Sequence, residues 1–256
     1  MHNNPIGIFD SGVGGITILR SIQKILPKED IIYLSDNLNS PYGKKTKEEI
    51  TRLSKKNTEW LIEKGCKIIV VACNTATTNS ISHLREIFSL PFIGVEPAIK
   101  TASNNTKTGS IGVLATKGTL SSDLFNITSN DYCSNINIIE TVGEGLVDLI
   151  ENGILEGKSL EKQLSKFLTP MINANIDFLV LGCTHYPLII DSIMKILPKN
   201  IKILDSGTAV ANQTKKILIQ NNLLNNIEGS NSNFYCNSTS NSLKNILGNN
   251  FKIEAI

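Results

Sequence analysis

The chain has no long hydrophobic run: none of its apolar stretches approaches the ~20 residues that a membrane-spanning helix requires. Its first residues, Met-His-Asn-Asn-Pro, include no basic cluster, and Asp10 interrupts the early apolar run, so a secretory signal is not expected. Lysine and arginine are scattered, and the net charge of +2 indicates neither a nucleic-acid nor a membrane partner. These absences predict a soluble cytoplasmic protein.

The cysteines show no metal-binding or disulfide pattern. They are odd in number, none forms a C-x-x-C pair, and a cytoplasm would keep them reduced: Cys66, Cys73, Cys133, Cys183 and Cys236. Histidines and carboxylates lack paired-ligand spacing as well, so we expect no metal. No lysine lies in a context typical of a pyridoxal phosphate site, and we expect no cofactor.

What is present is the alternation of short β-branched runs with amphipathic stretches. The 256 residues, 41% hydrophobic and 19% charged, are typical of a soluble enzyme with a real core. We expect strands at residues 6–9, 31–34, 68–72 and 92–95, with a helix that stops at Pro27 and another that ends near Gly65. Strands that alternate with helices predict parallel sheets covered on both faces.

The series restarts after a polar segment, residues 101–110, which we predict to be a connection between units. Residues 111–116 mirror residues 6–11, and the strand before Cys183 mirrors the strand before Cys73. We therefore predict two similar parallel-sheet α/β domains related by pseudo-twofold symmetry, with the active site in the cleft between them. Residues 1–97 plus 207–256 would form the first domain and residues 98–206 the second. Strands near 233–236 and 251–254 would complete the first sheet.

Cys73 and Cys183 are set in near-twin contexts, Val-Val-Ala-Cys73-Asn-Thr and Val-Leu-Gly-Cys183-Thr-His. Each follows a buried strand, and open α/β sheets bind ligands at the carboxyl ends of their strands. We also expect each thiol at a helix N-terminus, which would lower its pKa from ~8.5 toward neutrality and suit it to acid–base catalysis. We interpret Cys66, Cys133 and Cys236 as inert core residues.

The glycine-rich turn Asp10-Ser11-Gly12-Val13-Gly14-Gly15 matches neither a P-loop nor the dinucleotide-binding pattern. Two interpretations stay open: its backbone N–H groups bind a carboxylate or phosphate, or the glycines only make a tight turn. Asp10 favours a functional role, because a carboxylate at a strand end suits proton transfer.

Two further groups could join this chemistry. Pro41-Tyr42-Gly43 is either an ordinary turn or a loop whose backbone donors hold a second carboxylate. His185 lies two residues after Cys183, close enough to tune that thiol or to protonate a ligand. His2 and His83 are interpreted as structural.

Four motifs, taken together, resemble those of the glutamate racemases, a group within the aspartate/glutamate racemase superfamily. The two cysteine motifs identify the superfamily, and the Pro-Tyr-Gly loop favours glutamate within it. The resemblance runs essentially end to end and rests on Asp10-Ser11-Gly12-Val13-Gly14-Gly15, Pro41-Tyr42-Gly43, Cys73-Asn74-Thr75-Ala76 and Gly182-Cys183-Thr184-His185-Tyr186-Pro187.

The resemblance implies a cofactor-independent two-base interconversion of L- and D-glutamate, which supplies D-glutamate for bacterial peptidoglycan. One cysteine would remove the α-proton as a thiolate while the other, as a thiol, delivers a proton to the opposite face. Cys73 would act on D-glutamate with help from Asp10, and Cys183 on L-glutamate with help from His185.

Further roles are implied by position. Glu151 would support the histidine, and Glu144 is the alternative, because the stretch before Glu151 departs from the Cys-Pro-Leu-like sequence of many members. The implied substrate contacts are Ser11, Pro41, Tyr42, Gly43, Asn74, Thr75, Thr116, Thr119 and Thr184.

Three alternatives stay open: a racemase of aspartate or another small acid, a two-lobed amino-acid-binding protein, and a Cys–His hydrolase that uses Cys183 and His185. The partner we expect is a small-molecule substrate, glutamate, with no nucleic acid and no membrane. The sequence leaves the oligomeric state open, and a homodimer is compatible with it.

Overall fold

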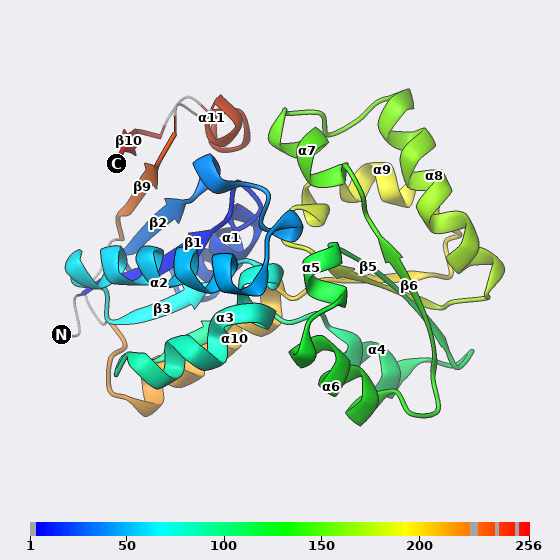
Figure 1. Cartoon of the computed structure of the whole chain (residues 1–256), viewed down its shortest axis with the longest axis horizontal. Coiled ribbons are helices and arrows are strands. Elements are labelled where there is room, and N and C mark those ends of the chain that lie inside the picture. Colours follow the sequence, from blue (N-terminus) through cyan, green and yellow to red (C-terminus); the bar gives the residue numbers. More distant parts are fainter. Residues whose placement is uncertain (1–3, 226–229, 239–240, 249–250) are drawn as a thin grey trace.

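The computed structural model describes residues 4–225, 230–238, 241–248 and 251–256, and places two parallel β-sheets side by side (Figure 1). The first sheet has the order β10-β9-β2-β1-β3-β4 and the second the order β6-β5-β7-β8. Every strand pair is parallel. Within the described ranges, no helix combines the length and apolar content needed to cross a bilayer.

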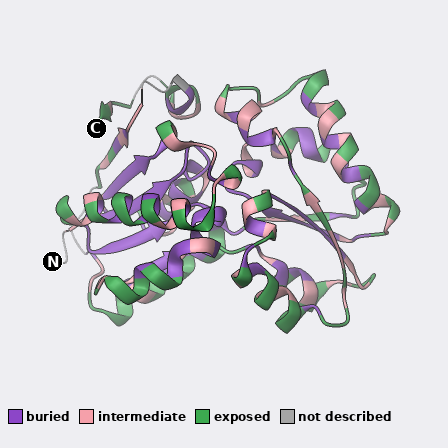
Figure 2. Ribbon diagram, in the orientation of Figure 1, coloured by how far each residue is buried: buried purple, intermediate pink, exposed green. Residues whose placement is uncertain are grey.

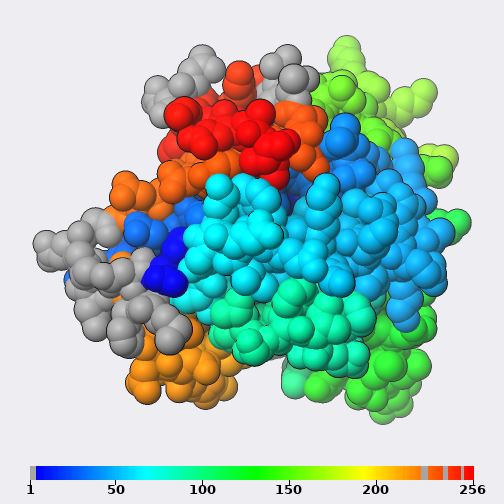
Figure 3. All heavy atoms as spheres, turned by 60° about the vertical axis from the view of Figure 1, so that its left-hand side comes forward, coloured from blue at the N-terminus to red at the C-terminus, as the bar shows by residue number. Residues whose placement is uncertain are grey.

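The first sheet is built from both ends of the chain. Its strands are β1 (Ile6–Asp10), β2 (Ile31–Ser35), β3 (Ile68–Val71), β4 (Phe92–Gly94), β9 (Ser232–Cys236) and β10 (Ile253–Ala255). Its helices are α1 (Ile16–Ile25), α2 (Lys47–Glu63), α3 (Asn74–Ile87), α10 (Gly207–Gln220) and α11 (Asn241–Leu247). The predicted return of the C-terminal strands to this sheet is confirmed, because β9 pairs with β2. Figure 3 shows the C-terminal segment against the residues of α2.

The second sheet comes from one continuous stretch of chain. Its strands are β5 (Ser110–Ala115), β6 (Asn137–Val142), β7 (Phe178–Gly182) and β8 (Lys202–Leu204). Its helices are α4 (Ile99–Asn105), α5 (Lys117–Leu120), α6 (Asp123–Tyr132), α7 (Leu146–Glu151), α8 (Lys158–Asn173) and α9 (Ile190–Met194). The order β6-β5-β7-β8 repeats the order β2-β1-β3-β4, which confirms two similar parallel-sheet units. The domain limits given above stay a prediction.

Apolar residues on alternate sides of each strand hold the layers together. In β1, Phe9 packs beneath α2 and α3, whereas Ile6 and Ile8 pack beneath α1 and α10. Figure 2 shows the result: buried strands between helices that are exposed on their outer sides. Helix α1 ends just before Pro27, because proline has no N–H to donate and its ring obstructs the preceding turn.

The prediction that residues 101–110 form an irregular connection is wrong for its first half. Residues Ile99–Asn105 form α4, and Ile99 and Ala102 are fully buried on one face of it. Two apolar residues in an otherwise polar segment are too weak a periodic pattern to predict a helix from the sequence.

A buried ion pair joins the loops at the amino ends of the first sheet. Lys67 Nζ lies 2.6 Å from Glu29 Oε2, and each side chain is 1% exposed. Glu29 Oε1 also accepts a hydrogen bond from the backbone N–H of Asn225, after α10. The pair therefore links three segments that are far apart in the sequence, those of Glu29, Lys67 and Asn225.

Replacing Lys67 with alanine should reduce the free energy of unfolding by about 3–5 kcal/mol, because it leaves the Glu29 carboxylate buried without its cation. Urea unfolding measures this. Lys55→Ala is the matched control: its partner Glu59 lies one turn along α2 and both side chains are half exposed, so the loss should stay below about 1 kcal/mol. Equal losses in the two variants would contradict the prediction.

Candidate active site

The two thiols in twin contexts lie in one place. Cys73 follows β3 and Cys183 follows β7, so each stands at the carboxyl end of a central strand of its own sheet. Both line the same small cavity of about 10 Å³. That volume holds roughly one water molecule. The two sheets thus bring one sulfur each to a single point.

The cavity lining collects most of the residues that the sequence analysis singled out. It also contains Val147 of α7, which the sequence analysis missed, because no motif marks that residue. The lining is Ser11, Pro41, Tyr42, Gly43, Cys73, Asn74, Thr75, Thr116, Val147, Cys183, Thr184 and His185. Asp10, Glu151 and Thr119 lie behind this layer, in hydrogen-bond contact with it.

Asp10, the last residue of β1, is fully buried beside both cysteine loops. Its carboxylate accepts hydrogen bonds from the Gly12 N–H at 2.7 Å and from the Thr184 hydroxyl at 3.1 Å. Burial raises the pKa of Asp10 to about 6, although the nearby His185 and these hydrogen bonds oppose the rise. The group therefore titrates close to neutral pH, where a proton-transfer residue is most useful.

His185 and Glu151 form a pair behind Cys183. His185 Nε2 lies 2.7 Å from Glu151 Oε1, and its Nδ1 lies 3.7 Å from Cys183 Sγ. Burial would lower the pKa of His185, but the contacts with Cys183 and Glu151 and the charge of Asp10 raise it well above its usual range. The pair therefore favours an imidazolium that faces the sulfur. Glu144, the alternative acid, is exposed in the loop before α7.

The glycine-rich turn makes room for this pair. A Cβ on Gly12 would overlap Glu151 Oε1, and a Cβ on Gly14 would overlap the His185 ring. The N–H groups of Gly12 and Val13 are already used by Asp10 and Glu151. The interpretation of these two N–H groups as an anion site for a ligand is therefore wrong, because the protein's own carboxylates occupy them.

The environment of Cys73 differs from the prediction. Cys73 does cap α3, and its sulfur accepts a hydrogen bond from the Ala76 N–H at 3.4 Å and contacts the Ser11 hydroxyl at 3.6 Å. Burial and the adjacent Asp10 nevertheless raise the pKa of the thiol to about 12, because desolvation outweighs the helix terminus. Cys183 does not begin a helix: a turn follows it, and the 3₁₀ helix η3 (Tyr186–Ile189) starts three residues later.

Tyr42 lines the cavity, while its hydroxyl lies in a buried polar cluster. The hydroxyl donates to Asp36 Oδ2, and the Asn57 amide donates to the same hydroxyl at 3.1 Å. These contacts fix the short 3₁₀ helix η2 (Tyr42–Lys44), which places Gly43 against Thr116 of the second unit.

Three threonine hydroxyls close the cavity between the two units. Thr75 Oγ1 of α3 lies 2.7 Å from Thr116 Oγ1 and 3.2 Å from Thr119 Oγ1, on either side of the start of α5. The hydroxyls of Thr75 and Thr116 can therefore serve a ligand only by exchanging their mutual contact for it.

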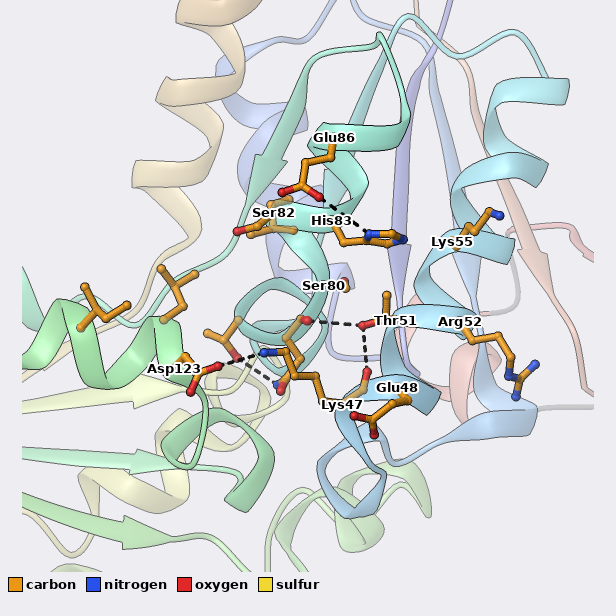
Figure 4. Close-up of a pocket in the computed structure, with 15 residues that line it drawn as sticks. Lys47, Glu48, Thr51, Arg52, Lys55, Ser80, Ser82, His83, Glu86 and Asp123 are labelled. Atoms are coloured by element: carbon orange, nitrogen blue, oxygen red, sulfur yellow. Dashed lines mark hydrogen bonds and ion pairs between the residues drawn. The ribbon is translucent and has the colours of Figure 1, made fainter.

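A larger hollow of about 720 Å³ lies outside this site, between α2, α3 and α6 (Figure 4). It contains neither Cys73 nor Cys183. Some of its charged side chains pair with one another, as Lys47 does with Asp123 at 2.9 Å and His83 with Glu86 at 4.0 Å. No group of three or more potential metal ligands occurs among the residues that the structure describes.

Comparisons with known proteins point to one family. The family model described as Asp/Glu/Hydantoin racemase matches residues 6–214. A glutamate racemase of Herpetosiphon aurantiacus is 44% identical over 225 residues, 88% of this chain and 89% of that protein. A glutamate racemase of Bacillus anthracis superposes with a TM-score of 0.91 at 31% identity, over 100% of this chain and 98% of that one. The Francisella tularensis enzyme, solved in complex with D-glutamate, gives 0.88 at 31% identity, with coverage of 100% and 98%.

Replacing Gly12 with alanine should destabilise the protein by about 1–3 kcal/mol, because the new methyl group displaces Glu151 from His185. Thermal unfolding measures the effect. In a Glu151→Ala background the same substitution should cost little, since the space is then vacant. A full penalty in both backgrounds would show that the turn itself, and not the approach of Glu151, requires glycine.

Replacing Asp10 with asparagine should stabilise the protein more at pH 7.5 than at pH 4. The pKa of Asp10 is raised on folding, so its contribution to stability is present below pH 3.8 and is lost as the pH rises through about 6. A pKa shift of this size corresponds to about 3 kcal/mol in the free energy of unfolding. Urea unfolding of the variant and the parent at both pH values tests this, and a difference independent of pH would contradict it.

Proposed function

This chain belongs to the Asp/Glu/Hydantoin racemase family, and we propose that it interconverts L- and D-glutamate without a cofactor, using Cys73 and Cys183 as its two bases. The observation that carries the proposal is that one thiol from each unit lines the same cavity. A racemase that uses two bases needs a proton acceptor on one face of the α-carbon and a proton donor on the other. The names of the similar proteins support glutamate as the substrate.

The two thiols have unequal surroundings, and this asymmetry suggests which role each one takes. Cys73 has a raised pKa and stays a thiol, ready to donate a proton. Cys183 faces the His185 imidazole, whose protonated form stabilises a thiolate. For L-glutamate we therefore assign removal of the α-proton to Cys183 and delivery of a proton to the other face to the Cys73 thiol.

The opposite direction starts from the protonation state that one turnover leaves behind. After L-glutamate has reacted, Cys73 is a thiolate and Cys183 a thiol, which is the form that D-glutamate requires. The substrate ammonium group stabilises a thiolate on either side of the α-carbon, because its positive charge lowers the energy of a thiolate beside it. Asp10, with a pKa of about 6, lies close enough to assist Cys73.

The carbanionic transition state needs donors already aimed at the substrate carboxylates. Asn74, Thr75 and Thr184 at the two strand ends are the residues to which we assign this role, together with Ser11 and the loop Pro41–Gly43. Because the cavity holds about 10 Å³, a glutamate enters only when the units part at contacts such as Thr75–Thr116. Closure then removes water, which strengthens each polar contact.

We assign the reaction to the cytoplasm and to the supply of D-glutamate for peptidoglycan. The five cysteines are all free and buried, which is consistent with a reducing compartment. The competing substrate is aspartate or another small acid. A turnover panel of glutamate, aspartate and hydantoins, followed by circular dichroism, separates these options.

In D₂O, each enantiomer of glutamate should acquire deuterium at the α-carbon as it is converted. Early in the reaction the deuterium should appear in the enantiomer formed, while the remaining substrate keeps protium, because two different groups remove and deliver the proton. Proton NMR combined with chiral chromatography measures both pools. A pure amino-acid-binding protein would incorporate no deuterium, and equal labelling of both pools would indicate a single base.

Replacing Cys73 or Cys183 with serine should reduce racemisation by at least about a thousandfold, because serine is too weak an acid and base to replace a thiol. Each variant should keep one-sided chemistry, such as elimination from a halogenated glutamate of one configuration. Full racemase activity in the Cys183→Ser protein would exclude the two-base scheme.

A further inference from the structure

We propose that Asn37 is a positioning residue for the Cys183 side of the reaction: its amide holds the Glu151 carboxylate against His185, and His185 acts on Cys183. This inference rests on the proposed function. Asn37 belongs to the 3₁₀ helix η1 (Asn37–Asn39) of the first unit, whereas Glu151, His185 and Cys183 belong to the second. A residue of one unit thus fixes the base of the other.

The hydrogen bonds of Glu151 define the arrangement. Its Oε2 accepts from Asn37 Nδ2 at 2.8 Å, and its Oε1 accepts from the Val13 N–H at 2.8 Å while facing His185 Nε2 at 2.7 Å. The Glu151 side chain is only 13% exposed, so water cannot easily replace a lost donor. Without Asn37, only Oε1 is held, and the carboxylate can rotate about that atom, which weakens its alignment with His185.

The orientation of the Asn37 amide is itself fixed by a hydrogen bond to its oxygen. Ser238 donates its hydroxyl to Asn37 Oδ1 at 3.3 Å, so the amide nitrogen must point toward Glu151. The neighbouring Asn237 accepts the Leu38 N–H at 2.9 Å and so anchors the backbone of η1. Both residues directly follow β9, so the C-terminal part of the first sheet sets the orientation of a side chain that serves the second unit.

The same short helix provides a matched comparison. Asn39, two residues away, donates its amide to Asp36 Oδ1 at 2.7 Å and takes part in the polar cluster around Tyr42. The two asparagines therefore share a residue type and a helix but act on different targets: Asn37 on Glu151, and Asn39 on the Pro41–Gly43 loop. Loss of Asn39 should disturb both directions of the reaction alike.

The first experiment follows elimination from 3-chloroglutamate of L and of D configuration at the α-carbon. The thiolate takes the α-proton, chloride leaves the β-carbon, and the resulting enamine is hydrolysed to 2-oxoglutarate and ammonium. Each enantiomer reports on one cysteine only. Racemisation cannot report this difference through kcat/KM, because the equilibrium constant of one makes that ratio equal in both directions.

In Asn37→Ala, chloride release from the L compound should fall by roughly ten- to a hundredfold, the range expected when a charged group loses a hydrogen-bond partner. Release from the D compound should change by less than about threefold. Asn37→Asp should be more severe on the L side, because a second carboxylate repels Glu151. Asn39→Ala should affect both compounds equally. Equal losses with both compounds in Asn37→Ala would overturn the proposal.

A second measurement does not depend on activity. Nitrogen-15 NMR should give a lower pKa for His185 in Asn37→Ala than in the parent or in Asn39→Ala, because the imidazolium loses part of its contact with Glu151. The groups that face His185 are Glu151, Asp10 and Cys183, and all three remain in these variants. His83, exposed on α3 beside Glu86, is the internal reference.

The outcomes separate the two proposals. If the parent protein releases chloride from neither compound and does not racemise glutamate, the proposed function fails, while the His185 titration still tests the contact. If the parent is active and the His185 titration is the same in Asn37→Ala, the positioning role of Asn37 fails and the proposed function stands. Retention of D-side elimination in Asn37→Ala shows that the variant is folded.

Discussion

The site depends on one contact between the two units: a pair of side chains from the second unit inserts into the glycine-rich turn of the first. Glu151 and His185 occupy the space that side chains at Gly12 and Gly14 would fill, and the Val13 N–H holds the inserted carboxylate. This contact joins the two units at the carboxyl ends of their sheets. Both sulfur atoms line one cavity at this junction.

The buried charges of the site follow from the same insertion. Asp10, Glu151 and His185 are removed from water together, so each carboxylate must be satisfied by protein donors or by the imidazole. The cationic partner lies on the Cys183 side, and the anionic Asp10 lies beside Cys73, whose pKa is raised. Two cysteines with nearly identical sequence contexts therefore become chemically different.

Much of the fold and of the cavity lining could be predicted from the sequence, because strand ends and motifs are local signals. The apolar runs before Cys73 and Cys183 located β3 and β7, and the repeated pattern indicated two similar parallel-sheet units. What could not be predicted depends on contacts between distant segments. The raised pKa of Cys73 comes from burial, and the contact of Asn37 with Glu151 joins residues 114 positions apart. No local pattern encodes either.

The order of the strands along the chain also determines when each half becomes complete during synthesis. The ribosome delivers β5 to β8 without interruption, but it releases β9, the neighbour of β2, only after the whole of the second sheet. The edge of β2 that pairs with β9 therefore stays unpaired until the second sheet has been synthesised. Since Ser238 follows β9 and contacts Asn37, the hydrogen bond that orients the Asn37 amide toward Glu151 can form only after the second sheet has been synthesised.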